Sequence, residues 1–327
     1  MAVTAKDVAR AAGVSQATVS YVINDNPNQR ITPATRARVL AAVAELGYTP
    51  SAAARALRKG TSDVVLLLLP DIPIGPTAAR IMEAFTDDLE PFGLTAVTRR
   101  MRAGKSATDA WREVRPVAIV ALGTLTDVEA EALRIAEIPM LSTTFSPISG
   151  GSGASVPQVP IGRLQVEHLA ATGHRTIGYA APDDARVNDF FRRRLDGVRS
   201  ACLDLGLDDP VVLPVHLDAR HAEAAVRAWL GRAVPVTAVC AYNDDTAFAL
   251  LAGLHRAGLS APRDLAVIGV DNIPLASLAS PPLTTIDQNV DRLVDYLARE
   301  VAHLVLNGPA PMPLRSDAVS LVIRESA

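Results

Sequence analysis

Five residues in the stretch GVSQATVSYVIN, which covers residues 13–24, recur at the spacing i, i+1, i+4, i+5 and i+8. A helix places residues at this spacing on one face. They are Gln16, Ala17, Ser20, Tyr21 and Asn24. A glutamine can pair with an adenine edge and an alanine can meet a thymine methyl, while Thr18, Ser20 and Asn24 suit phosphate oxygens. This face therefore has the chemistry to contact duplex DNA, and the alternative is a solvated polar helix surface.

A second set of polar residues follows apolar runs in the larger, C-terminal part of the chain. They are Asp71, Asn243, Asp244 and Asp271. Because ligands of parallel α/β sheets bind beyond the carboxyl ends of the strands, we expect these residues at one cleft. Carboxylates and amides offer acceptors and donors to hydroxyl-rich ligands. For Asp271 the alternative is a strand-end acid that binds nearby backbone amides.

No set of side chains has the spacing of a catalytic or metal centre. The glycine-rich segment GGSGAS has Val156 where a nucleotide loop needs its third glycine. The same segment has Ala154 where a serine-hydrolase elbow needs glycine. The two closest histidines, His216 and His221, are five residues apart, which is not a metal-ligand spacing. We therefore expect no enzyme activity, no cofactor and no metal.

Three short helices are predicted in the first 48 residues from their end signals. Thr4 begins a capping-box pattern that opens the first helix. Ser15 caps the second, which runs to about residue 24. Thr32, followed by proline, opens the third, which ends at Gly47. These helices would hold the polar face of residues 16–24 on a small separate unit.

The first two helices match a helix-turn-helix pattern. Ala9, Gly13 and Val19 stand where that motif needs a small residue, a turn glycine and a core residue. Residues 1–60 carry eight basic and three acidic groups, a net charge of +5, whereas the remainder carries −8. A basic small unit attached to an acidic large one indicates a polyanion partner for the small unit.

The alanine-rich stretch 49–60 is predicted to be either a plain linker or a conditional helix. It is at the lower edge of the ~12–15 residues that an isolated helix needs, so it should order only when packed or bound. Leu57 is its one large apolar side chain. Such a side chain can act as a wedge between base steps in the minor groove.

The rest of the chain alternates apolar, strand-like runs with helical patterns. This alternation runs from residue 64 to 143, pauses at the loop 146–160, and resumes with a helix at Gly162 that is followed by further strands up to Asp271. Buried apolar strands that alternate with helices predict doubly wound parallel sheets. The two similar halves would enclose a cleft.

The sequence shows no pattern typical of a membrane helix, a signal peptide or a disulfide. The longest apolar run, residues 64–69, is far shorter than the ~18 residues of a membrane helix. Charged residues interrupt any signal-peptide pattern at the N-terminus. Cys202 and Cys240 lie among apolar neighbours and are read as buried small hydrophobes. We expect a cytoplasmic, nucleoid-associated protein with no membrane partner.

Two groups of segments resemble a known family. KDVARAAGVSQATVSYVIN, TRARVLAAVAELGYTP and AARALRKGTSDVVLLLLPD resemble the headpiece, hinge helix and first strand of LacI/GalR-type transcriptional repressors. VEHLAATGHRTIGYAAP, AVCAYNDDTAFALLAGLHRAGL and LVIRES are similar to the family's effector domain, which shares its fold with periplasmic sugar-binding proteins. The resemblance implies a repressor that binds a palindromic operator as a homodimer and responds to a small-molecule effector, a sugar or other metabolite.

The resemblance also implies a domain organisation. The headpiece would cover residues 1–48, the hinge helix 49–60 and the effector-binding core 61–327. The N-subdomain of the core would comprise about 61–158 and 289–316, and the C-subdomain about 159–288 and 317–327. Because the sequence ends just after LVIRESA without a heptad tail, we expect a dimer without a tetramerising coil.

The family pattern assigns site residues position by position. Gln16, Ala17 and Tyr21 take base-reading places, and Leu57 takes the place of the minor-groove leucine. The full expected DNA-binding set is Thr4, Ser15, Gln16, Ala17, Thr18, Ser20, Tyr21, Asn24, Arg30, Ala54 and Leu57. The expected effector-binding set is Asp71, Gln158, Phe190, Arg194, Asn243 and Asp271.

The sequence departs from the family pattern at three places. Gln158 and Val159 replace the usual Asp-Asn pair, and IPIGPT replaces NPFF after the first strand, so no aromatic ring is supplied there. Tyr21 stands where the family usually has arginine, which prefers guanine, so the half-site should differ at that base pair. The alternative interpretation is a solute-binding sensor whose headpiece lacks specific operator binding.

Overall fold

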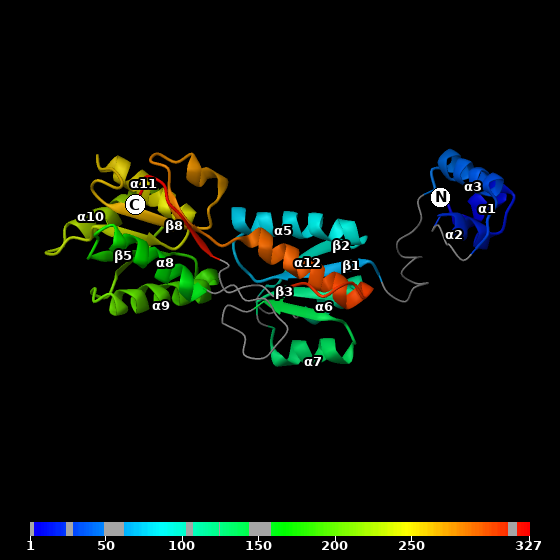
Figure 1. Cartoon of the computed structure of the whole chain (residues 1–327), viewed down its shortest axis with the longest axis horizontal. Helices are drawn as coiled ribbons and strands as arrows, with labels where there is room; N and C mark the ends of the chain where they lie inside the picture. Colours follow the sequence, from blue (N-terminus) through cyan, green and yellow to red (C-terminus); the bar gives the residue numbers. More distant parts are fainter. Residues whose placement is uncertain are drawn as a thin grey trace. The chain divides into compact units, whose positions relative to one another are not determined.

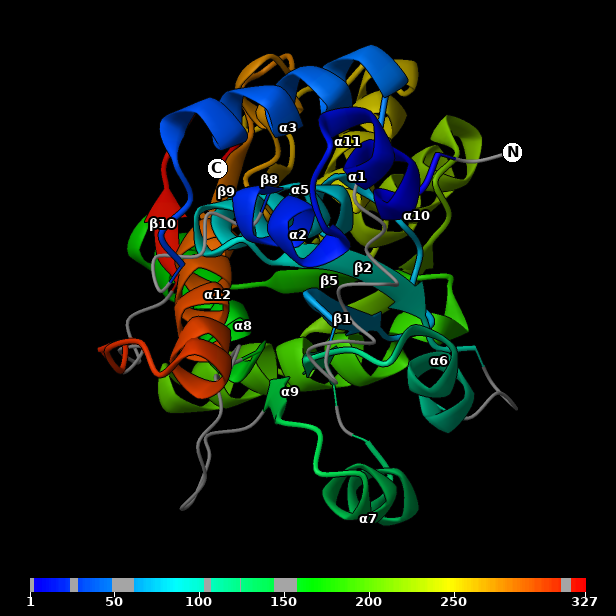
Figure 2. The same ribbon diagram turned by 90° about the vertical axis from the view of Figure 1, so that its right-hand side faces the viewer.

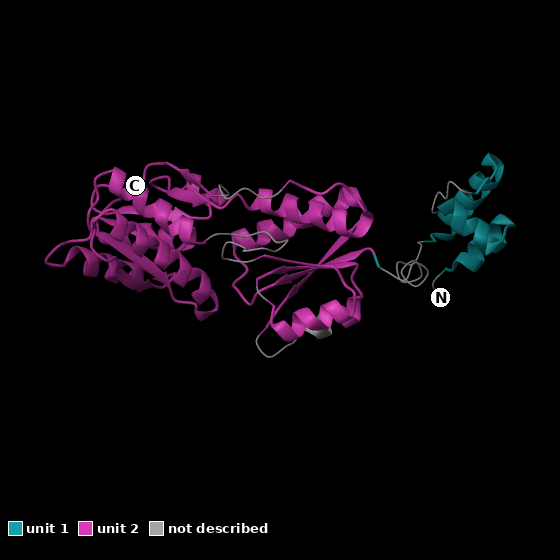
Figure 3. Ribbon diagram, turned by 60° about the horizontal axis from the view of Figure 1, so that its bottom comes forward, with its two compact units in different colours: residues 1–62 teal, residues 63–327 magenta. Residues whose placement is uncertain are grey.

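The computed structural model describes residues 3–23, 29–48, 62–102, 107–123, 125–143, 158–312 and 319–327. The chain forms two compact units, residues 1–62 and 63–327 (Figure 3). The predicted hinge at 49–60 and the segment GGSGAS lie outside the described residues. Within the described part, no helix is both long and apolar enough to cross a bilayer.

The described part of unit 1 contains three helices, and all three predictions are confirmed. They are α1 (Ala5–Ala12), α2 (Gln16–Ile23) and α3 (Pro33–Leu46). The Asp7 carboxylate accepts the backbone N–H of Thr4 at 3.0 Å, and Ser15 Oγ accepts the N–H of Thr18 at 3.1 Å. Gly13 follows α1 at φ 64°, a left-handed conformation that glycine adopts without steric cost. The turn between α1 and α2 is therefore set by local sequence.

A small apolar core joins the three helices of unit 1. Val8, Val19 and Val39 come one from each helix, and none of the three is exposed to solvent. Ala9, Ala12, Val22 and Ala42 complete this core. The predicted valine seam of α2 is thus confirmed, and the seam fixes which face of α2 points away from the core.

Unit 2 contains two α/β lobes, and the predicted doubly wound parallel sheets are confirmed. The first lobe has the parallel strand order β2-β1-β3-β4. Helices α5 and α12 pack on one face of this sheet, and α6 and α7 cover the other (Figures 1 and 2). The elements are β1 (Val64–Leu69), α5 (Pro76–Leu89), η1 (Glu90–Phe92), β2 (Thr95–Arg100), α6 (Ala107–Val114), β3 (Ala118–Leu122), α7 (Asp127–Ile135), β4 (Met140–Thr143) and α12 (Val290–Leu306).

The second lobe is built on a six-stranded sheet of order β10-β9-β8-β7-β5-β6. Its strands are parallel except β10, which pairs antiparallel with β9. Helices α10 and α11 cover one face, and α8 and α9 cover the other (Figure 1). The elements are α8 (Gln158–Ala171), β5 (Ile177–Pro182), η2 (Ala185–Val187), α9 (Asn188–Asp204), β6 (Val211–Val215), α10 (Ala219–Leu230), β7 (Ala238–Ala241), α11 (Asp244–Arg256), β8 (Ala266–Val270), η3 (Pro274–Ser277), β9 (Thr284–Asp287) and β10 (Ser320–Val322).

Helix α8 begins earlier than the sequence pattern indicated. We expected a loop up to residue 160 and a helix from Gly162, but the helix starts at Gln158. Pro160 lies in the first turn, where proline removes no intrahelical hydrogen bond, so it does not end the helix. Gln158 is therefore held on a helix terminus.

Two glycines let α8 and α9 approach each other at backbone distance. A Cβ on Gly162 would lie 2.0 Å from the carbonyl oxygen of Arg194, and one on Gly197 would lie 2.1 Å from that of Val159. Neither contact is sterically possible, so both positions require glycine. This close contact fixes the N-terminal half of α9, which carries Phe190 and Arg194.

Candidate functional site

The first candidate site is the face of α2 opposite the valine seam. Gln16 and Ala17 are exposed, and Ser20 and Tyr21 are partly exposed. Asn24, the last predicted member of this face, lies outside the described residues, as do Ala54 and Leu57. The structure thus presents four of the five predicted side chains together on the surface of unit 1.

Residues predicted to flank that face have local structural roles as well. Ser15 Oγ and Thr18 Oγ1 lie 2.9 Å apart at the start of α2. The hydroxyl of Thr4 donates to the Asp7 carboxylate at 2.6 Å, and this hydrogen bond is the largest cause of the lowered pKa of Asp7. Arg30 is exposed, beyond the segment after α2. Thr4 therefore serves first as a helix cap.

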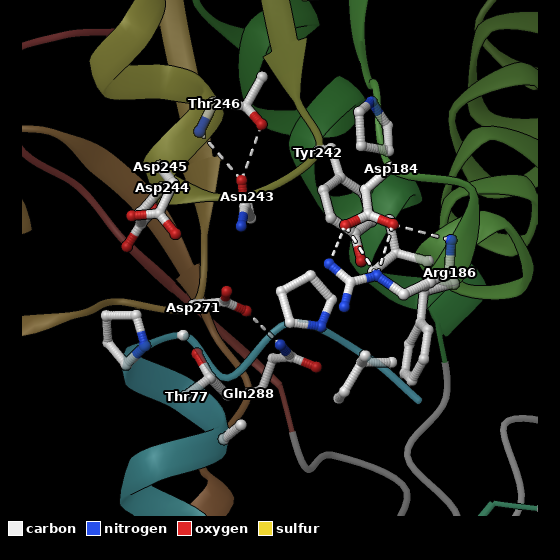
Figure 4. Close-up of a pocket in the computed structure, with 18 of the residues that line it drawn as sticks. Thr77, Asp184, Arg186, Tyr242, Asn243, Asp244, Asp245, Thr246, Asp271 and Gln288 are labelled. Carbon is white, nitrogen blue, oxygen red and sulfur yellow. Dashed lines mark hydrogen bonds and ion pairs between the residues drawn. The ribbon is translucent and has the colours of Figure 1, made fainter. Parts of the chain in front are cut away.

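The second candidate site is a cavity of about 630 Å³ in unit 2 (Figure 4). Its walls come from the carboxyl-terminal ends of strands in both lobes, where ligands of open α/β sheets bind. Five of the six predicted effector residues line it. They are Gln158, Phe190, Arg194, Asn243 and Asp271. A cavity of this size accommodates a small organic ligand.

Asp71 is the one predicted effector residue that is not among the residues lining the cavity. Its neighbours Pro70 and Ile72 do line the cavity. The Asp71 carboxylate lies 3.4 Å from Nε of Arg100, which ends the adjacent strand β2. An ion pair with the neighbouring strand thus holds this side chain, and strand position alone did not predict that.

Arg194 is buried in the cavity wall, where its side chain contacts Gln158 and Tyr242. Only 4% of the residue is exposed, Nε donates to Gln158 Oε1 at 2.8 Å, and Nη1 donates to the Tyr242 carbonyl at 2.6 Å. Its guanidinium carbon lies 4.8 Å from the centre of the Tyr242 ring, within cation–π range. Gln158, which departs from the family pattern, therefore orients Arg194.

Asp271 connects the two lobes across the cavity. It accepts a hydrogen bond from Gln288, between β9 and α12 (Figure 4). Its φ of 114° is a strained backbone conformation for a residue other than glycine. Burial raises the pKa of its carboxyl group, while a side-chain hydrogen bond from Thr77, at the start of α5 in the first lobe, acts to lower that pKa. The end of β8 thus holds a strained carboxylate at the junction of the lobes.

Asn243 and Asp244 form the start of α11. Asn243 Oδ1 accepts the N–H of Thr246 at 3.0 Å, which caps the helix. Asp244 accepts the N–H of Ile273 at 2.9 Å and the hydroxyl of Thr285 at 2.6 Å. Burial raises the pKa of Asp244 to about 7. Asp244 therefore fastens β8 and β9 to α11, and Asn243 leaves its amide group at the cavity.

The cavity also contains polar residues that the sequence did not single out. They are Asp183, Asp184, Arg186, His216, Tyr242 and Asp245. They follow β5, β6 and β7, with Arg186 in η2 and Asp245 in the first turn of α11, so a strand-end rule extended to the residues after every strand would have found them. Arg186 pairs with both carboxylate oxygens of Asp184, which lowers the pKa of Asp184, and His216 Nδ1 contacts Asp183.

The segment IPIGPT forms part of the apolar wall. Ile72 and Pro73, from the segment that replaces the family's NPFF, line the cavity. Ile81, Leu122 and Leu293 add further apolar surface from the first lobe. This wall is suited to the apolar face of a ligand, while the polar groups lie mostly on the second lobe.

Family profiles match both units of the chain. A profile described as bacterial regulatory proteins, lacI family, matches residues 4–51, and one described as periplasmic binding protein-like domain matches residues 166–327. The chain is 30% identical to the HTH-type transcriptional repressor PurR of Photobacterium profundum, over 89% of this chain and 88% of that protein. These matches cover the α2 face and most of the cavity-lining residues.

Two solved structures resemble the chain over nearly its whole length. A Lac repressor dimer bound to operator and the anti-inducer ONPF has a TM-score of 0.82 and 26% identity, covering 100% of this chain and 99% of that one. A complex of the transcriptional regulator CelR with cellobiose has a TM-score of 0.66 and 28% identity, covering 99% and 100%. Both contain a small organic ligand.

Proposed function

The chain belongs to the LacI family of bacterial regulatory proteins and is a DNA-binding transcriptional regulator, and we propose that it represses transcription by binding a palindromic operator as a homodimer. Its family consists of regulators and not of enzymes. The observation that carries the proposal is the exposed polar face of α2 opposite its buried valine seam. The +5 charge of residues 1–60 supports binding to a polyanion. Such a protein acts in the cytoplasm, on the nucleoid.

Each residue of the expected DNA-binding set, on the α2 face and around it, has a proposed role. Gln16 and Ala17 read base edges from the first turn of α2, the part of a recognition helix that enters the major groove. Thr4, Ser15, Thr18, Ser20, Asn24 and Arg30 contact the phosphate backbone. Tyr21 contacts a base pair, while Ala54 and Leu57 act from the hinge segment. Two copies of this face on one dimer account for a palindromic site.

We further propose that the cavity of unit 2 binds a hydroxyl-rich effector. The cellobiose ligand of CelR supports this class, since CelR matches this chain over 99% of its length. Asn243, Arg194 and Asp271 provide polar contacts from three different elements. Gln158 positions Arg194, and the Phe190 ring packs against the ligand. The proposal thus assigns specificity to the second lobe.

Coupling between the two sites follows from the position of Asp271. Its hydrogen bonds reach Thr77 in the first lobe and Gln288 between the lobes. A ligand that replaces these partners changes the free-energy difference between two arrangements of the lobes. When only one arrangement permits the hinge segments to order on DNA, the effector changes operator affinity, and operator binding changes effector affinity equally.

An electrophoretic mobility-shift titration with the DNA upstream of the protein's own gene tests the regulator proposal. We expect a complex that survives excess unrelated DNA, and Gln16→Ala should weaken it about tenfold or more because a bidentate base contact is lost. Glu45→Gln, at an exposed position of α3, is the matched control. Equal affinity for operator and unrelated DNA would favour the solute-binding sensor instead.

A further inference from the structure

The cavity of unit 2 has a surplus of negative charge. Five carboxyl groups and two guanidinium groups are among its lining residues, a formal charge of −3 with His216 neutral. The acids are Asp183, Asp184, Asp244, Asp245 and Asp271, and the bases are Arg186 and Arg194. A ligand must therefore be compatible with an acidic site, provided that these charges are not already compensated.

Both guanidinium groups of the lining are engaged by protein acceptors. Arg186 Nε donates to Asp184 Oδ1 at 2.9 Å, and Nη2 donates to Oδ2 at 2.5 Å. Arg194 donates to Gln158 and to the Tyr242 carbonyl. Arg186 is paired with a carboxylate and Arg194 is held by two neutral acceptors, and the net negative charge of the lining opposes an anionic ligand. Arginine therefore organises the wall here, in contrast to its use as a phosphate or carboxylate receptor.

The N-terminus of helix α5, which carries the positive end of the helix dipole, already faces carboxylates of the protein. Thr77, in the first turn of α5, donates to Asp271. Oδ2 of Asp245 lies 3.8 Å from the point that a Cβ on Gly75, the N-cap residue of α5, would occupy. A helix N-terminus attracts anions, and here two carboxylates of the second lobe already face it. It offers no vacant place to a ligand phosphate.

Asp245 differs from the other carboxyl groups of the cavity. It is half-buried, and its carboxylate has no hydrogen bond or ion pair with another described residue. Asp244, next to it in the chain, is held by Ile273 and Thr285. Asn243, Asp245 and Asp271 all line the same cavity (Figure 4). A hydrogen-bond donor on a ligand would therefore stabilise Asp245 more than the carboxylates that already accept protein hydrogen bonds.

We propose that Asp245 selects the effector by charge, pairing with the ammonium group of a hydroxyl-rich amine such as an amino sugar and excluding phosphorylated or carboxylated ligands. This inference rests on the proposed effector role of the cavity. Asn243 and Asp271 bind hydroxyl groups of the same ligand. The pair gains strength from its partly buried position, because water screens it less than at the surface. A neutral analogue gains only an ordinary hydrogen bond to Asp245.

Thermal unfolding with matched ligand triplets tests this selectivity. Each triplet holds one mono- or disaccharide scaffold as the neutral, the aminated and the phosphorylated compound, for example glucose, glucosamine and glucose 6-phosphate. Ligands that bind the folded state raise Tm with their affinity. For the scaffold that fits, we expect the aminated compound to bind about tenfold more tightly than the neutral one, a difference typical of a charged hydrogen bond. The phosphorylated compound should cause no shift.

The variant Asp245→Asn should abolish the preference for the amine and leave operator binding in the absence of ligand unchanged. Asp196→Asn, at an exposed position of α9 outside the cavity, is the control and should retain the preference. The assignment is overturned when no aminated compound raises Tm, when the phosphorylated member binds best, or when Asp245→Asn keeps the wild-type order. Those outcomes leave the operator-binding result intact, whereas loss of selective operator binding contradicts the proposed function itself.

Discussion

At the scale of residues, the cavity shows how neighbouring acids acquire different tasks. Asp244 is buried and accepts hydrogen bonds from Ile273 and Thr285, and Asp271 accepts one from Gln288 at the junction of the lobes. Among the described residues, the Asp245 carboxylate has no hydrogen-bond or ion-pair partner. All three side chains are carboxylates, and they differ in the hydrogen-bond donors that their oxygens contact. A substitution at each should therefore affect a different property: stability, coupling or ligand selectivity.

Asp271→Ala should abolish the response of operator binding to the effector while operator affinity without effector stays within about twofold. The substitution removes the acceptor for Thr77 and Gln288, and α2 is in the other unit. Asp196→Ala, at an exposed position of α9 that does not line the cavity, is the control. Fluorescence anisotropy with labelled operator measures both quantities. A wild-type response in Asp271→Ala would remove Asp271 from the effector site.

Asp244 should make stability depend on pH. Its pKa rises from the ordinary value of 3.8 to about 7 in the folded state, so the folded protein binds more protons than the unfolded chain between these values. The free energy of unfolding should therefore fall as pH rises from about 4 to about 7, by up to about 1.4 kcal/mol per pH unit from this group, and level off above. Urea unfolding at pH 5.5 and 8 measures it.

The variant Asp244→Asn should flatten that pH profile while lowering stability overall, because one acceptor for Ile273 or Thr285 is lost. The raised pKa values of Asp271 and Asp245 act in the same direction, so a smaller slope should remain. An identical slope in wild type and Asp244→Asn would show that Asp244 is ionised in the folded state at acidic pH.

Tyr21→Arg should change which half-site the protein prefers. A tyrosine offers one hydroxyl and a ring, whereas arginine offers a bidentate fork that matches guanine. We expect the variant to gain affinity for half-sites with guanine at the base pair that residue 21 meets. Binding selection from a randomised half-site library measures the preference. A guanine already required by the wild type at that position would contradict the argument.

At the scale of elements, the glycine contact between α8 and α9 positions the polar wall of the cavity. Gly162 meets the backbone of Arg194, and Gly197 meets that of Val159. The backbone of α9 is thus fixed where Arg194 must reach Gln158 on α8. Helix packing at this point and the hydrogen bond between the two side chains support each other.

Gly162→Ala should destabilise unit 2 by about 3 kcal/mol or more, at or above the upper end of overpacking effects, because the new methyl would lie 2.0 Å from a backbone oxygen. Glu167→Ala, at an exposed position of the same helix, should change stability by less than about 0.5 kcal/mol. Chemical denaturation followed by circular dichroism measures both. A stability loss in Gly162→Ala no larger than in Glu167→Ala would contradict the close packing.

Sequence patterns predicted most elements because strands and helices here are marked by local signals. The capped helices of unit 1 and the apolar strand of residues 64–69 carry such signals. Strands β9 and β10 and helix α12 were not predicted individually, since their places depend on chain crossings between lobes. For the cavity, the strand-end rule located Asn243 and Asp271. It could not tell that Asp71 pairs with Arg100 while Asp245 lines the cavity, because that depends on side-chain contacts.

At the scale of the whole molecule, the proposed function requires that operator binding by unit 1 and effector binding by unit 2 influence each other. Coupling of this kind requires that effector and operator favour different arrangements of the same protein, with a typical effect of about 5- to 150-fold on affinity. The acidic cavity and the basic first unit have opposite formal charges, so DNA is attracted to the first unit and repelled by the cavity.

The most direct test of this coupling is an anisotropy titration of labelled operator by the full-length protein, with and without a compound that raises its Tm. The account predicts that the compound changes operator affinity at least about fivefold, and that Asp271→Ala removes the change. A compound that raises Tm through the cavity and leaves operator affinity unchanged would contradict the account.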